Sequence, residues 1–230
     1  MKLLCLPYAG GTAQVFKNLF KTCLDASIEI VPIELPGRGN RFSEALKTDF
    51  NELLEDILKK VLDVIQDEAE YALFGYSMGS RVIFEIYYSL LKYNVKKPKI
   101  MFFCAAKPPE IHYVKKKMDR FSIIREMKEL GGTKEEVLEN EQLMDIFVPI
   151  MGADMQVLFS YNYILKNAKI SVPIVILYGT KDTEVLPYID KWRNYTDKEC
   201  EFIAYNDGHF FINKYYKDMA KEINVRLVYR

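Results

Sequence analysis

The chain has 230 residues, of which 50% are hydrophobic and 28% are charged, and its 32 Lys and Arg residues balance 32 Asp and Glu residues. This balance is typical of an ordinary globular protein and excludes disordered, collagen-like and low-complexity classes. Because no basic excess attracts polyanions, we expect no nucleic-acid partner.

Six short apolar runs alternate with helical patterns along the chain. Most of these runs are apolar at nearly every position, which is typical of strands covered on both faces of a sheet. The predicted strands span residues 2–6, 28–35, 71–74, 100–105, 172–178 and 201–205. Strands that alternate with helices predict an α/β fold with a mostly parallel sheet and helices on both faces. Functional sites in such sheets lie beyond the carboxyl ends of the strands.

Three helices between and after these strands carry clear amphipathic patterns. The first begins after Thr48, a predicted N-cap, and repeats apolar residues from Phe50 to Ile65 at i, i+3, i+4 spacing. The second follows Gly79, and the last runs from about Asn213 to the end of the chain.

Residues 108–169, which we call the lid segment, contain no predicted strand. Helical patterns cover residues 121–129, 134–143 and 144–165, and Thr133 with Glu136 predicts a capping box before the second helix. Ordinary crossover helices are the alternative, but most connections are much shorter. We therefore expect one domain, residues 1–230, in which the lid segment covers the site.

The sequence Gly75-Tyr76-Ser77-Met78-Gly79 has the G-x-S-x-G pattern between a buried-type strand and an amphipathic helix. This is the setting of a nucleophile elbow, a turn so tight that small residues must flank it. The turn raises the Ser77 hydroxyl above the sheet and places the Met78 amide at a helix N-terminus, where negative charge is stabilised.

A serine needs a neighbouring base to act as a nucleophile, and the chain has two histidines. His209 follows the last predicted strand in a loop with Gly208, so it can reach the carboxyl edge of the sheet. His112 stands among charged residues at the start of the lid segment, where we expect it to be solvated. His209 is therefore the predicted base.

An acid that orients the histidine is expected after a strand between Ser77 and His209. Asp182 follows the fifth predicted strand and has this position, whereas Glu184 and Asp207 are the rival acids. We favour Asp182, which would hold the imidazole tautomer and stabilise the imidazolium without taking the proton.

The loop after the first strand, residues 7–13, contains Gly10 and Gly11. Two glycines allow the backbone to turn its amides toward a site, and Ala9 is the predicted second oxyanion donor. The spacings of phosphate-binding glycine motifs are absent from this loop, so nothing in it predicts a nucleotide site.

Two cationic stretches are predicted to lie at the surface. Residues 35–41 form a Pro- and Gly-containing turn that carries Arg38 and Arg41, and the residues alone favour a surface loop. The run Lys115, Lys116 and Lys117 is predicted to be solvent-exposed, and docking of an acidic partner is the alternative.

The four cysteines, Cys5, Cys23, Cys104 and Cys200, are far apart and form no CxxC pair. Together with only two histidines, this predicts free thiols in a reducing compartment and no metal site. The apolar start ends at Pro7, too early for a signal peptide, and no uncharged stretch approaches the ~20 residues of a membrane span. We therefore expect a cytoplasmic protein with no membrane partner.

These motifs resemble those of type II thioesterases, the stand-alone α/β-hydrolases that accompany nonribosomal peptide and polyketide synthases. The resemblance covers essentially the whole chain. It depends on residues 6–13 (LPYAGGTA), 35–41 (LPGRGNR), 75–79 (GYSMG), 130–144, 179–182 (GTKD) and 208–211 (GHFF). The stretch 130–144 is the most specific part, because general esterases share the catalytic residues but not this lid sequence.

The resemblance implies that Ser77, Asp182 and His209 are a catalytic triad and that the amides of Ala9 and Met78 form the oxyanion hole. It implies hydrolysis of acyl groups on the 4′-phosphopantetheine arm of acyl or peptidyl carrier proteins, through an acyl-enzyme that releases stalled or misprimed chains. No cofactor of the enzyme itself is implied, and a monomer is the default expectation.

The chain departs from the family pattern at three places. Tyr76 replaces a common histidine, Asp207 replaces a common glycine, and Gly152 begins a Gly-Ala-Asp sequence, ending at Asp154, where Arg-Ala-Asp is frequent. The last departure leaves the role of the lid residues open.

Apolar residues near the elbow either shape the acyl pocket or belong to the core; they are Tyr8, Tyr76, Met78, Phe210 and Phe211. The alternative functions are a general carboxylesterase, a fatty-acyl thioesterase and a non-enzymatic binding protein on the same scaffold.

Overall fold

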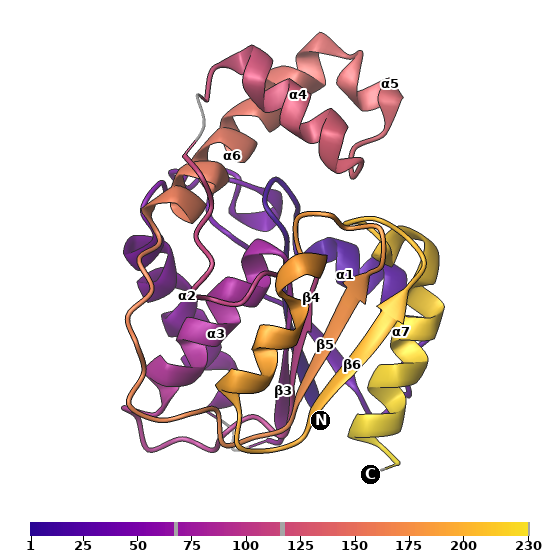
Figure 1. The fold of residues 1–230 in the computed structure, drawn as a ribbon. Coiled ribbons are helices and arrows are strands. Elements are labelled where there is room, and N and C mark those ends of the chain that lie inside the picture. The colour runs from indigo at the N-terminus through magenta and orange to yellow at the C-terminus, as the bar shows by residue number, and fades with distance from the viewer. Residues whose placement is uncertain (67–68, 116–117, 230) are drawn as a thin grey trace.

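Six parallel strands form one sheet in the order β2-β1-β3-β4-β5-β6 (Figure 1). The computed structural model describes residues 1–66, 69–115 and 118–229. The strands are β1 (Lys2–Leu6), β2 (Glu29–Pro32), β3 (Tyr71–Tyr76), β4 (Met101–Cys104), β5 (Ile174–Gly179) and β6 (Cys200–Tyr205). All six predicted strands are present, with small differences at their ends. The predicted parallel α/β architecture is therefore confirmed.

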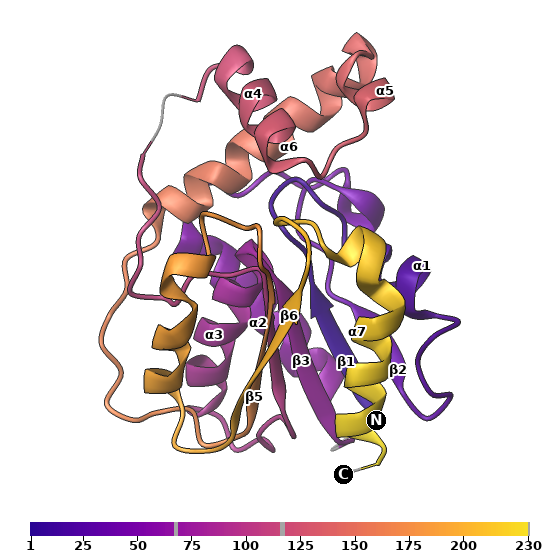
Figure 2. The ribbon, with the colours of Figure 1, turned by 45° about the vertical axis from the view of Figure 1, so that its right-hand side comes forward.

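The sheet separates two hydrophobic cores, because successive side chains of a strand point to opposite faces. Leu4 and Leu6 of β1 pack into the core that contains α2 and α3, whereas Leu3 and Cys5 pack into the core that contains α1 and α7. Figure 2 shows α7 covering its face of the sheet, with α2 and α3 on the other. These helices are α1 (Gln14–Phe20), α2 (Phe50–Ile65), α3 (Met78–Leu90) and α7 (Ile212–Leu227).

Local features of some helices differ from the predictions. The N-cap of α2 is Asp49 and not Thr48, because the Asp49 carboxylate accepts the N–H groups of Asn51 and Glu52. Helix α1 and the 3₁₀ helix η2 (Leu186–Tyr195) were not predicted. Helix α1 has seven residues, too few to display a helical period.

The lid segment contains α4 (Arg120–Leu130), α5 (Glu135–Leu138) and α6 (Glu141–Ser160), which lie above the carboxyl ends of the strands (Figure 2). The predicted boundary between the second and third helices is wrong. Asn140 adopts an extended conformation and its side chain accepts the Leu143 N–H, so α6 begins before Met144. The predicted capping box is also wrong, since the N-cap of α5 is Lys134, which makes no side-chain cap bond.

Helix α6 is, among the described residues, the one helix long and apolar enough to cross a membrane by length and composition. More than half of its most apolar stretch is buried inside the protein. That burial is typical of a core helix, and Figure 1 shows α6 running from the body of the molecule up to α4 and α5. The apolar composition of α6 is therefore only weak evidence for a membrane span.

Candidate active site

The turn between β3 and α3 places Ser77 at the tip of a strained elbow. Ser77 has φ +52° and ψ −110°, a backbone conformation that L-residues rarely adopt. A Cβ atom at Gly75 would lie 2.5 Å from the Gly79 carbonyl, and a Cβ at Gly79 would lie 2.3 Å from the Leu6 carbonyl oxygen. Both glycines are therefore required by close backbone approach, as the G-x-S-x-G pattern predicts.

The packing at Gly79 leads to a stability prediction. Gly79→Ala should lower the free energy of unfolding by about 3 kcal/mol, because its methyl group would overlap the backbone of β1. Urea denaturation followed by circular dichroism measures this. Gly208→Ala is the matched control, since no heavy atom lies within 4 Å of a Cβ there. Equal midpoints for the two variants would show that the elbow has room for a side chain.

Ser77, His209 and Asp182 form a hydrogen-bonded chain. His209 Nε2 lies 3.0 Å from Ser77 Oγ, and His209 Nδ1 lies 2.6 Å from Asp182 Oδ2. Asp182 is 5% exposed, and its other carboxylate oxygen accepts the N–H groups of Glu184 and Val185, each at 3.2 Å. The carboxylate is thereby oriented, and it turns the imidazole so that Nε2 faces the serine.

The rival residues take other partners. The Glu184 carboxylate pairs with the Lys107 ammonium at 2.6 Å, and Asp207 accepts the Gly208 N–H at 2.8 Å. His112 is exposed at the start of the lid segment. The geometry therefore brings together the three side chains that the sequence favours.

Tyr76 connects the elbow to the histidine loop. Its hydroxyl donates a hydrogen bond of 2.6 Å to the His209 carbonyl oxygen. Burial raises the pKa of Tyr76 well above its ordinary value, so the phenol stays protonated as a donor. The sequence does not predict this hydrogen bond, because Tyr76 and His209 are 133 positions apart.

The loop after β1 turns at Ala9 and Gly10. The Gly11 N–H donates to the Tyr8 carbonyl oxygen at 3.0 Å, and Gly10 has φ +76°. This is a type II turn, which needs glycine at its third position. Ala9 lines the same cavity as Ser77 and His209, and Met78 is the first residue of α3. Ala9 thus shares a cavity with the serine and Met78 follows it in the chain, while the donor role of their amides stays a prediction.

The prediction of a surface loop at residues 35–41 is wrong, since Arg38 is 3% exposed and Arg41 is 7% exposed. Both guanidinium groups are buried because they pair with carboxylates, some of them distant in sequence. Arg41 pairs with Glu44 and Asp56, and Arg38 pairs with Asp154 of α6, 116 positions away. Asp154 is the functional candidate that the sequence analysis missed; its only signal was its place in the Gly-Ala-Asp stretch.

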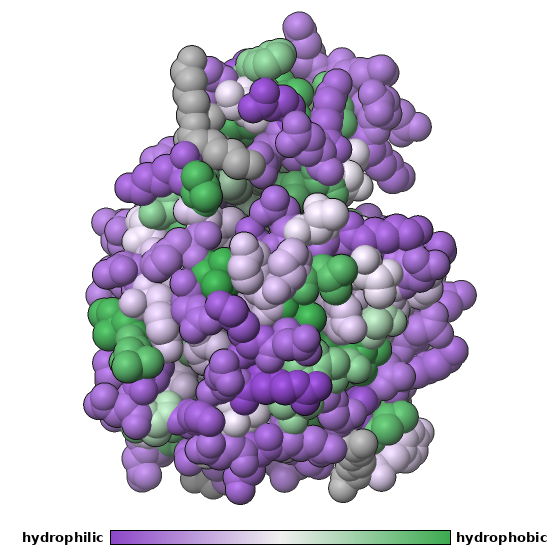
Figure 3. All heavy atoms as spheres, viewed as in Figure 1, coloured by the Kyte–Doolittle hydropathy of each residue, from purple (hydrophilic) through white to green (hydrophobic). Residues whose placement is uncertain are grey.

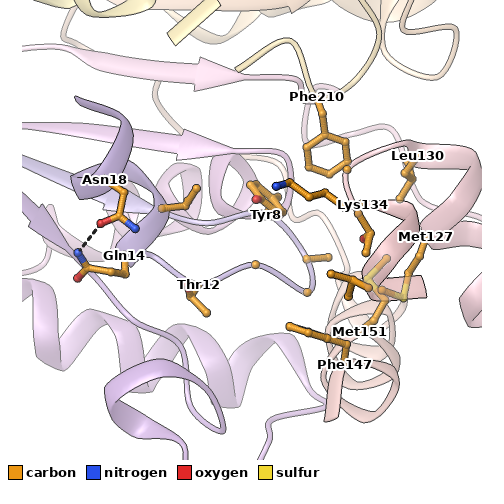
Figure 4. A pocket seen from close by; sticks show the side chains of 17 residues that line it. Tyr8, Thr12, Gln14, Asn18, Met127, Leu130, Lys134, Phe147, Met151 and Phe210 are labelled. Atoms are coloured by element: carbon orange, nitrogen blue, oxygen red, sulfur yellow. Dashed lines mark hydrogen bonds between the residues drawn. The ribbon is translucent and has the colours of Figure 1, made fainter. Parts of the chain in front are cut away.

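The described part of the lid segment helps to line a pair of cavities. The cavity that contains Ser77 and His209 has a volume of about 180 Å³. A larger one of about 460 Å³ shares three lining residues with it: Ala9, Leu130 and Met151. Figure 4 shows the larger cavity, in which the Lys134 side chain points toward Tyr8 beneath Phe210. Figure 3 shows the surface hollowed between the lid helices and the body of the molecule.

The structure separates the five aromatic and apolar residues near the elbow into two groups. Tyr8 and Phe210 line the larger cavity. Tyr76, Met78 and Phe211 are fully buried in the cores, so their side chains do not shape a pocket.

A parallel sheet, a serine at the strained β3–α3 turn, a histidine after the last strand and a helical lid together define an α/β-hydrolase. The chain belongs to the thioesterase family: the sequence profile of the Thioesterase domain matches residues 1–226. Within that family it resembles the type II thioesterases, as the motifs predict.

Three relatives illustrate the similarity. Thioesterase PikA5 of Streptomyces venezuelae is 27% identical over 99% of this chain and 81% of its own length. Gramicidin S biosynthesis protein GrsT of Aneurinibacillus migulanus is 30% identical over 92% of this chain and 83% of its own. The crystal structure of ClbQ from the colibactin NRPS/PKS pathway superimposes with a TM-score of 0.91 at 27% identity, over 98% of this chain and 96% of ClbQ.

Proposed function

We propose that the protein hydrolyses acyl thioesters on the 4′-phosphopantetheine arm of carrier proteins and so frees carriers blocked by stalled or misprimed acyl groups. The observation that carries this proposal is the Ser77–His209–Asp182 chain beneath the lid of a thioesterase-family protein. The names of GrsT and ClbQ, which refer to gramicidin S and to an NRPS/PKS pathway, support the choice of substrate.

The proposed reaction has two halves. His209 Nε2 takes the Ser77 proton while Oγ attacks the thioester carbonyl, and the amides of Ala9 and Met78 stabilise the oxyanion. The C–S bond then breaks, and the imidazolium returns its proton to the departing pantetheine sulfur. In the second half, water gives a proton to His209, attacks the acyl-serine and releases the free acid together with the restored Ser77 hydroxyl.

We also propose that residues 1–230 act as a single cytoplasmic domain and as a monomer, with acyl or peptidyl carrier domains as partners. This reaction uses only side chains, backbone amides and water, so the mechanism calls on no cofactor. Carrier docking at the lysine run of the lid segment stays a prediction, since Lys115 is exposed but Lys116 and Lys117 lie outside the described residues.

The test compares kcat/KM for three substrates with the same acetyl or propionyl group, carried on a carrier protein, on coenzyme A or as a p-nitrophenyl ester. We expect the carrier to be preferred by at least about tenfold, because carrier contacts add binding energy that the small esters lack. Equal values would indicate a general carboxylesterase.

Two further experiments test the remaining alternative functions. A strong preference for decanoyl over propionyl carriers would indicate a fatty-acyl thioesterase. Failure of a fluorophosphonate probe to label Ser77 would indicate a binding protein, because labelling requires an activated serine.

A further inference from the structure

A carboxylate of the lid segment reaches the turn that carries the oxyanion donor. Asp154 of α6 is 2% exposed, and its Oδ2 accepts the Gly10 N–H at 2.7 Å. The Arg38 guanidinium, itself 3% exposed, donates to both oxygens of Asp154 and completes a bidentate pair. A helix that covers the site thus holds a backbone amide next to Ala9.

The amide held by Asp154 belongs to the central peptide of the type II turn, between Ala9 and Gly10. This peptide is the unit that rotates by about half a turn when a type II turn becomes type I. Arg38 also donates to the Gly11 carbonyl oxygen at 3.4 Å, so it contacts the Gly11–Thr12 peptide, two peptides further along the loop. The pair therefore selects one orientation of the chain directly after the Ala9 amide.

Helix α6 touches this turn at a second point. Met151 lies one turn before Asp154, and a Cβ at Gly10 would lie 3.2 Å from the Met151 sulfur. Buried ion pairs add little net stability compared with apolar packing, because desolvation offsets their attraction. A bidentate Arg–carboxylate pair instead fixes geometry. Because the Arg38–Asp154 pair lies against the turn, we infer that it orients the turn and does not serve stability alone.

We propose that Asp154 is a positioning residue for the oxyanion hole. It holds the Ala9–Gly10 peptide so that the Ala9 N–H faces the developing oxyanion, and Arg38 holds Asp154. The oxyanion hole is then complete only while α6 is seated on the turn. This inference rests on the proposed role of Ala9 as the oxyanion donor.

The decisive comparison uses two variants. Asp154→Asn leaves an oxygen that can accept the Gly10 N–H but deprives Arg38 of its charged partner. The double variant Arg38→Met/Asp154→Leu removes the acceptor and leaves no unpaired buried charge. The two variants should therefore rank differently by stability and by activity. The double variant should be more stable than Asp154→Asn but less active.

For the double variant we expect kcat to fall by about 10²-fold with KM changed by less than about threefold, because a misplaced donor weakens only transition-state binding. Phosphonylation of Ser77 by a fluorophosphonate should slow by a similar factor, since the phosphoryl oxygen needs the same donor. Phosphonylation requires no thioester, so it tests this inference even if the protein proves not to be a thioesterase.

Glu85→Gln is the matched control. Glu85 pairs with Lys166 at 2.6 Å, and their side chains are 11% and 18% exposed, so this variant also disrupts a largely buried pair. It should lower Tm without changing kcat. If the double variant does not fold, Asp154→Ala replaces it, because water can enter the space beside Arg38. A folded acceptor-free variant with kcat and phosphonylation rate within about threefold of wild type overturns the proposal.

Discussion

Ser77→Ala is expected to lower kcat for an acyl-carrier substrate by about 10⁶-fold, because no other group in the mechanism forms the acyl-enzyme. The thermal midpoint should change little. The hydroxyl contacts the His209 ring at 3.0 Å, and alanine carries the same strain as serine at φ +52°. Single-turnover release of the free acid, together with differential scanning calorimetry, measures both quantities.

Ser89→Ala provides the control for this experiment, since Ser89 lies near the far end of the same helix α3. It should keep wild-type turnover. If Ser77→Ala retained more than about a thousandth of the wild-type kcat, Ser77 would lose its role as the nucleophile.

Asp182→Asn is expected to lower kcat by about 10⁴-fold. Asp182 Oδ1 accepts two backbone N–H groups, so the asparagine oxygen should stay there and its amide nitrogen should face His209. An amide donor at Nδ1 stabilises the tautomer whose proton is on Nε2. That nitrogen can then no longer accept the Ser77 proton, although the geometry is unchanged.

Asp207→Asn is the matched control. The Asp207 carboxylate accepts the Gly208 N–H, whereas the His209 ring is hydrogen-bonded to Asp182. Its kcat should stay within a few-fold of wild type, and the pH dependence of kcat should be recorded for both variants. The reverse order of effects would make Asp207 the acid.

The fold was predictable from local patterns. Nearly continuous apolar runs marked most of the six strands, because strands covered on both faces leave few polar positions. Short elements were not predictable: α1 spans two turns, and the break between α5 and α6 depends on one Asn140 side chain. The predicted N-cap of α2 was also wrong, since the neighbouring residues Thr48 and Asp49 are both of types that cap helices.

The positions of Ser77, Asp182 and His209 were predictable because parallel strands bring their carboxyl-end loops to one edge of the sheet. The G-x-S-x-G pattern of the elbow is equally local, and Gly75 meets the backbone of the nearby Gly79, although Gly79 meets Leu6 of β1. The burial of Arg38 and Arg41 was not predictable, because a charged turn is normally solvated and their partners Asp154 and Asp56 lie far along the chain.

By itself, then, the sequence determined the sheet, the nucleophile turn, the order of the serine, acid and histidine, and the presence of a helical lid. These depend on residues close in the chain or on the rule that orders a parallel sheet. Only the tertiary structure decided that Tyr76 binds the His209 carbonyl, that Asp154 holds Gly10 and that Arg38 is buried beside it. Each of these contacts joins segments more than a hundred positions apart, and their meeting depends on how the lid and loops pack.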